Sequence, residues 1–189
     1  ILFVFVFISA LAIFKYLYSF GLRHNVNGKS AYVIRKKINA DVISLGTSNV
    51  LFSIVPDTFE RESGYTIYNL ATNHASLAEN LVHLHLYLKN NVKPKLVLLG
   101  ISAADLTLSD WSFHSYYFTP FLHDSLIAEL SRQEDPDFYY LGKIPFAAYA
   151  WYNEFTNPLV FKGYTHWLKS DTLAYWTKGS YFYPLDTMG

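Results

Sequence analysis

The sequence has no cysteine, a single methionine and few charged residues. Without cysteine the protein has no disulfide framework, no thiolate zinc site and no cysteine nucleophile. Its 15 basic and 15 acidic side chains cancel, whereas a nucleic-acid-binding protein carries a basic face, so we expect no nucleic-acid partner. Hydrophobic residues make up 51% of the 189 positions, which excludes a disordered chain and is enough for the core of one ordinary domain.

The uncharged run at the start of the sequence predicts a membrane anchor. Residues 1–14 contain no charge and one polar residue, Ser9. A spanning helix needs about 20 mainly apolar residues, and Lys15 can extend its amine to the interface from within such a helix. An aromatic belt typical of the interface follows at Tyr16, Tyr18 and Phe20. We therefore expect residues 1–22 to span a lipid bilayer, and we expect the sequence to be a fragment because it starts inside this run.

Two alternatives to an anchor exist for this run. Ala10-Leu11-Ala12 resembles the cleavage site of a signal peptide. A buried core helix is disfavoured, because the run is apolar on every face. The basic residues that follow place this side of the membrane in the cytoplasm by the positive-inside rule, but the other flank is not there to compare. These basic residues are Arg23, Lys29, Arg35, Lys36 and Lys37.

Strands and helices alternate after a polar stretch at 23–39, which we expect to be a linker or a short amphipathic helix. Strands are predicted at 40–45, 65–70 and 95–101, the last apolar on both faces as in a parallel sheet covered by helices. The alternation predicts an α/β fold with right-handed crossovers and a parallel sheet. The expected order is 2-1-3 for the strands near residues 42, 67 and 98.

The two helices between these strands have clear end signals. Pro56 opens a helix at 56–63, and Gly64 ends it. Ser76 is a good N-cap for a helix at 76–91, and Glu79 completes a capping box.

The second half of the chain differs from the first in composition and in its expected secondary structure. Residues 106–189 are rich in aromatic side chains, with helices expected at 123–132 and 137–155. We interpret this part as a helical insertion or cap, whose aromatic side chains either pack in a core or form a binding surface. The predicted division is an anchor at 1–22, a linker at 23–39 and one α/β domain at 40–189.

Parallel sheets bind ligands beyond the carboxyl ends of their strands. Here those ends are residues 46–49, 71–76 and 100–105. Ser48 follows the first strand through a glycine turn, which places its hydroxyl at the edge of the sheet near backbone N–H groups that stabilise an oxyanion. The alternative is that Ser48 is the N-cap of the next helix. Asp105 is either a group of the same site or another helix cap.

Three segments resemble the sequence blocks of the SGNH (GDSL-like) hydrolase superfamily. Gly46-Thr47-Ser48 resembles the first block, which carries the nucleophilic serine. Residues 68–76 resemble the second block, with Asn73 or His74 in the slot of the glycine whose amide enters the oxyanion hole. Residues 98–103 resemble the third block, with Ser102 in the asparagine slot. The resemblance covers residues 40–105 and is closest to the membrane-anchored branch, which includes D-alanyl transfer proteins and alginate O-acetylation proteins.

The resemblance implies a flavodoxin-like, three-layer fold in which Ser48 is the nucleophile. The amides of Ser48 and of Asn73 or His74, together with Ser102, then hold the oxyanion, with no cofactor and no metal. Members of the superfamily also carry an Asp-x-x-His block near the carboxyl terminus, but no aspartate here has a histidine three residues later. We expect the C-terminal part to be truncated before that block.

The resemblance implies a serine esterase or O-acyl transferase that is anchored in the bacterial cytoplasmic membrane and acts outside the cytoplasm on an envelope glycan or polymer. Its expected partner is a multipass membrane protein, such as a membrane-bound O-acyltransferase. The alternative is a non-catalytic accessory subunit of a larger membrane complex, favoured by the altered second and third blocks. Asn69 and Asn73 are common turn residues, and no histidine pair has the spacing of metal ligands.

Overall fold

The computed structural model describes residues 2–24, 29, 33–34, 38–103, 113–144, 147, 150, 153–169 and 176–181. The chain divides into two compact units. The helical unit contains residues 1–32 and 114–170, and the sheet unit contains residues 33–113 and 171–189. The domain boundaries 1–22, 23–39 and 40–189, which were drawn from composition, stay a prediction.

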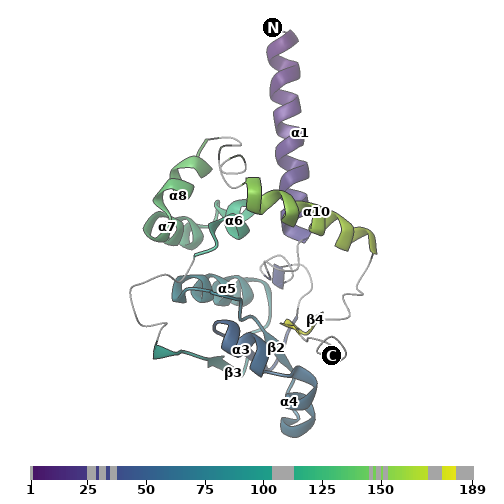
Figure 1. The fold of residues 1–189 in the computed structure, drawn as a ribbon, viewed down its shortest axis with the longest axis vertical. Coiled ribbons are helices and arrows are strands. Elements are labelled where there is room, and N and C mark those ends of the chain that lie inside the picture. Colours follow the sequence, from purple (N-terminus) through teal and green to yellow (C-terminus); the bar gives the residue numbers. More distant parts are fainter. Residues whose placement is uncertain are drawn as a thin grey trace, which may run out of the picture. The chain divides into compact units, whose positions relative to one another are not determined.

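The sheet unit is built on three parallel strands, β1 (Val42–Leu45), β2 (Ile67–Asn69) and β3 (Leu96–Leu99). Their order is β2-β1-β3, as Figure 1 shows. Val42 lies opposite Ile67 on one side and Leu96 on the other. The predicted α/β class, the parallel pairing and the strand order are confirmed.

Three helices connect these strands: α3 (Ser48–Ser53), α4 (Pro56–Ser63) and α5 (Leu77–Asn90). Helix α4 begins with Pro56 and ends at Gly64, whose φ of +74° is the left-handed conformation that favours glycine. The hydroxyl of Ser76 accepts the N–H of Glu79 at 3.1 Å at the start of α5. Both end signals predicted from the sequence are therefore confirmed.

The core of the sheet unit lies between β1, β2 and α5. Its fully buried side chains include Ile43, Leu70 and Tyr87. The hydroxyl of Tyr87 accepts the N–H of Ala40 at 2.9 Å and donates to the carbonyl of Ala40 at 3.2 Å. Burial raises the pKa of Tyr87, so this phenol stays neutral in the folded protein.

Strand β3 differs from the prediction that helices cover both of its faces. Leu96 is 50% exposed, Val97 is 39% exposed and Leu99 is 48% exposed. The exposure shows that the described helices leave these side chains of β3 uncovered, and β1 is the one neighbour of β3 in the described sheet.

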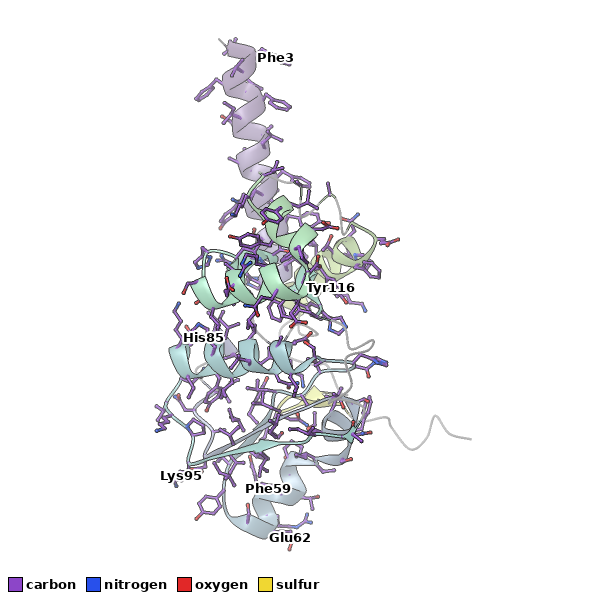
Figure 2. All side chains as sticks on the ribbon, turned by 90° about the vertical axis from the view of Figure 1, so that its left-hand side faces the viewer. Phe3, Phe59, Glu62, His85, Lys95 and Tyr116 are labelled. Atoms are coloured by element: carbon purple, nitrogen blue, oxygen red, sulfur yellow. The ribbon has the colours of Figure 1, made fainter. Side chains whose placement is uncertain are left out.

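Asp41 joins the beginnings of all three strands. Its carboxylate accepts the N–H and the hydroxyl of Thr66 at 3.1 and 2.8 Å, and it pairs with Lys95 at 2.9 Å. Its carbonyl also accepts the N–H of Lys95 at 2.7 Å. The hydrogen bond from Lys95, followed by those from Thr66, lowers the pKa of Asp41 to about 2. Figure 2 shows Lys95 at the start of β3.

A short hairpin covers the outer edge of β2. It consists of β4 (Trp176–Thr177) and β5 (Ser180–Tyr181), which pair in antiparallel fashion. The N–H of Asn69 donates to the carbonyl of Lys178 at 2.9 Å, and the amine of Lys178 pairs with Glu60. Residues far along the chain thus complete the sheet unit.

The helical unit contains α1 (Leu2–His24), α6 (Ser115–Phe118), the 3₁₀ turn η2 (Thr119–Phe121), α7 (Ser125–Glu134), α8 (Pro136–Gly142) and α10 (Asn153–Lys169). Asp124 caps α7, because its carboxylate accepts the N–H of Leu126 at 3.1 Å. Asp135 caps α8 in the same way, through the N–H of Phe138 at 3.0 Å. The single helix predicted at 137–155 is wrong, because α8 ends at Gly142 and α10 begins at Asn153.

Helix α1 is long and apolar enough to span a membrane. Its first part carries exposed apolar side chains, and Figure 2 shows Phe3 projecting from this part of the helix. In Figure 1, α10 crosses α1 near the carboxyl end of α1.

Candidate functional site

The turn after β1 has a backbone that glycine alone accommodates. Gly46 has a φ of +149°. A Cβ atom there would lie 2.5 Å from Cγ2 of Val50 and 2.9 Å from the carbonyl oxygen of Gly100. The close approach of Val50, on α3, and of the Gly100 carbonyl to this turn therefore depends on the missing side chain of Gly46.

The segments that leave the three strands meet at this turn. The N–H of Gly100 donates to the carbonyl of Leu45 at 3.0 Å, and the N–H of Thr72 donates to the carbonyl of Gly46 at 3.3 Å. Ser48 and Ser102 each follow a strand-ending glycine by two residues, and Asn73 and His74 directly follow Thr72. The predicted site residues therefore belong to loops that leave the same edge of the sheet.

Two buried asparagines fix this edge, and the sequence analysis did not assign either to the site. Oδ1 of Asn80, on α5, accepts the N–H of Gly46 at 2.8 Å. Nδ2 of Asn69, at the end of β2, donates to the carbonyl of Val50 at 3.1 Å, while its Oδ1 accepts the N–H of Ala71 at 2.9 Å. Asn69 was predicted to be a turn residue, whereas the structure places it at the end of strand β2. The signal for Asn80 is an amide on the buried face of α5, which carries Val82, Leu86 and Tyr87 but also the polar residues Glu79 and His83.

Ser48 is the first residue of α3, and Thr47 is the N-cap. The alternative in which Ser48 caps the helix is therefore wrong. Ser48 is partly exposed, and among the described residues no hydrogen bond occupies its hydroxyl. The backbone of α3 is held by Asn69, so the Ser48 hydroxyl is presented from a fixed turn.

The loop that follows β2 has a glycine-like backbone at the position where the second sequence block has a glycine, but the residue there carries a side chain. His74 has a φ of +56°, which is the left-handed region that favours glycine. Asn73 and His74 are both exposed, and the N–H of Ala75 closes the turn on the carbonyl of Thr72 at 3.4 Å. Ser102 is partly exposed in the third loop, and Asp105 lies outside the described residues.

A buried carboxylate on α5 holds the loop that follows β2 through a hydrogen bond. Glu79, on α5, is fully buried, and it accepts the hydroxyl of Thr72 at 2.8 Å. Within the described residues, no group of three His, Asp or Glu side chains is arranged to hold a metal ion. The carboxyl edge of the sheet therefore carries the Ser48 hydroxyl, backbone amides of the loops and polar side chains.

The fold and this edge define an α/β protein with a three-stranded parallel sheet and an N-terminal apolar helix. Comparisons with protein-family models, with curated proteins and with solved structures found no significant match.

Proposed function

We propose that the sheet unit is part of a flavodoxin-like SGNH domain and that Ser48 is the nucleophile of a serine esterase or O-acyl transferase. The observation that supports this most is the convergence of three loops on Gly46 at one edge of a sheet of order β2-β1-β3. The left-handed backbone at His74, in the glycine slot of the second block, adds to it.

The proposed reaction is acyl transfer in two steps. The Ser48 oxygen attacks an ester carbonyl while a base takes its proton, and the tetrahedral oxyanion is held by the amides of Ser48 and of Asn73 or His74, with Ser102. The ester C–O bond then breaks, and the alcohol leaves with the proton. Water or an acceptor hydroxyl attacks the acyl group in the second step and releases Ser48. The sequence has no Asp-x-x-His pair, so the proposal does not assign the base to a residue.

The proposed setting is the bacterial cytoplasmic membrane, with the sheet unit outside the cytoplasm. Helix α1 supplies the anchor, and the acceptor is a hydroxyl of an envelope glycan or polymer. A multipass membrane protein that delivers the acyl group, such as a membrane-bound O-acyltransferase, is the proposed partner.

Labelling with a fluorophosphonate probe tests this proposal in native membranes that contain the protein and its partners. The wild type should be labelled, and Ser48→Ala should lose the labelling and several orders of magnitude of acyl transfer. Ser53→Ala is the matched control, because Ser53 is an exposed serine at the other end of the same helix. Equal labelling of wild type and Ser48→Ala would overturn the enzyme proposal.

A non-catalytic accessory subunit is the second candidate, favoured by the exposed apolar side chains of β3. Such a subunit should keep the acyl transfer of its complex unchanged in Ser48→Ala. It should lose its place in that complex in Leu96→Asp or Leu99→Asp, which change exposed side chains of β3. Co-purification of the native membrane complex with each variant separates the two candidates.

A further inference from the structure

Helix α10 packs directly on the carboxyl end of α1. The hydroxyl of Tyr18 lies 2.8 Å from the hydroxyl of Thr156, and the hydroxyl of Tyr164 donates to the carbonyl of Leu17 at 2.8 Å. A Cβ atom on Gly21 would lie 2.6 Å from Cγ1 of Val160. The crossing is therefore close, and its polar and steric contacts hold α10 in place.

The side chains of α1 change from exposed to buried at the point where α10 packs on the helix. Most large apolar side chains from Leu2 to Leu17 are exposed, whereas Tyr18, Gly21 and Leu22 are buried. Leu159 completes the small core formed with Tyr18 and Leu22. The exposed apolar part of α1 thus ends within one helical turn of α10.

The crossing lies at the depth of a lipid headgroup layer when α1 spans a bilayer. Leu17 is the last exposed large apolar residue of α1, and Gly21 at the crossing follows it by four residues. At 1.5 Å per residue, this separation is about 6 Å along the helix. The headgroup and interfacial layer on each side of a bilayer is about 5–8 Å thick. Because α10 runs across α1 (Figure 1), its length extends along such a layer.

One face of α10 is turned toward the apolar part of α1. Asn157 bonds to Tyr18, and Tyr164 bonds to Leu17, so these two residues mark that face. Phe161 lies between them at helical spacing, four residues after Asn157 and three before Tyr164. Phe161 is 70% exposed, so this part of α10 carries a large apolar side chain that the protein itself leaves uncovered.

We propose that α10 lies in the headgroup layer of the bilayer that α1 enters, with Phe161 directed toward the acyl chains. The occupant of this face is lipid because the face continues the exposed apolar surface of α1, and amphipathic helices bind at this depth through such side chains. The helical unit is then a platform that fixes the protein at the membrane surface. The inference rests on α1 crossing the bilayer and is independent of chemistry at Ser48.

Spin labelling tests this proposal, because a chain without cysteine accepts a single label at a chosen site. Phe161→Cys and Lys162→Cys place nitroxides on neighbouring residues of α10 in the full chain, reconstituted in vesicles of phosphatidylethanolamine and phosphatidylglycerol. Both positions are exposed, but they lie on different faces. The label at 161 should collide mainly with oxygen, which dissolves in lipid, and the label at 162 mainly with a water-soluble nickel chelate.

Two other outcomes overturn the proposal. Equal access of nickel at 161 and 162 means that α10 lies in water. Shielding of position 161 from both reagents means that protein covers it, either a second copy or a partner. Phe7→Cys controls for the span, and its label should be reached by oxygen and not by nickel. The circular dichroism of each labelled variant should match the wild type, so that loss of the helix is not mistaken for exposure.

Discussion

At the scale of single residues, the turn that presents Ser48 depends on Gly46 having no side chain. Its φ of +149° and its closeness to Val50 both act against any replacement. Asn80 holds the turn itself in place, because its Oδ1 accepts the backbone N–H of Gly46 in a buried position.

Gly46→Ala is expected to destabilise the sheet unit. Backbone strain contributes roughly 1–3 kcal/mol, and the overlap with Val50 contributes a similar amount. Chemical unfolding in detergent micelles measures the loss. The control is Gly64→Ala, where φ is also positive but a Cβ atom meets nothing within 4 Å. The control should lose only about 1–2 kcal/mol, and equal losses in the two variants would contradict the role of packing at Gly46.

The Asp41 carboxylate should make the stability of the sheet unit depend on pH in the acid range. Its folded pKa of about 2 lies below the ordinary value of about 3.9. A lowered pKa stabilises the folded state above the ordinary value, and this contribution is lost as the pH falls through the folded value. The stability difference between wild type and Asp41→Asn should therefore be full above pH 5 and shrink steadily toward pH 2.

Lys95→Ala provides the control for this assignment, since Lys95 is the largest cause of the shift. The carboxyl carbon resonance of Asp41 should titrate at a higher pH in Lys95→Ala than in wild type. An unchanged titration midpoint would show that Lys95 does not set this pKa.

At the scale of helices and strands, the crossing of α1 and α10 depends on Gly21. In an exposed helix, alanine is more stable than glycine by about 1 kcal/mol. Here the added methyl group would overlap Val160, so the tertiary contact reverses the ordinary preference.

Gly21→Ala is expected to loosen α10 from α1. Amide hydrogen exchange of residues 153–165 should become faster, because the contacts of Tyr18 and Tyr164 are pulled apart. Ala12→Leu, on the exposed part of α1, is the control and should leave this exchange unchanged. Adding Val160→Ala to Gly21→Ala should restore part of the protection, since it removes the side-chain overlap.

At the scale of the whole molecule, the proposed membrane location depends on one apolar helix. Helix α1 has the length and the hydropathy of a span, and its exposed side chains have no other cover within the described residues. The carboxyl end of this helix is also part of the helical unit, because Tyr18 and Leu22 form a small core with Leu159.

Alkaline carbonate extraction of membranes should leave the protein in the pellet. Replacing Phe3, Phe5 and Phe7 with aspartate should release it into the supernatant, because three charges inside a span are unfavourable, each by up to about 2.5–3.5 kcal/mol on insertion scales. N-terminal sequencing of the protein from membranes should find residues 1–12 retained. A mature chain beginning near Ile13 would instead identify a cleaved signal peptide.

The sequence by itself determined the features that depend on neighbouring residues. Pro56 and Gly64 bound α4, and Ser76 caps α5, because each acts on backbone groups within a turn of itself. The alternation of strands and helices also determined the strand order, because crossover handedness and short connections leave few other arrangements.

Only the tertiary structure decided the features that join distant parts of the chain. Asn69 contacts α3 and the far hairpin, Asn80 reaches the turn at Gly46, and Tyr18 meets Thr156. Local propensity carries no information about such partners, since the partners are set by how the elements pack. The exposure of β3 belongs to the same group, because burial of an apolar strand depends on which elements lie over it and not on its own composition.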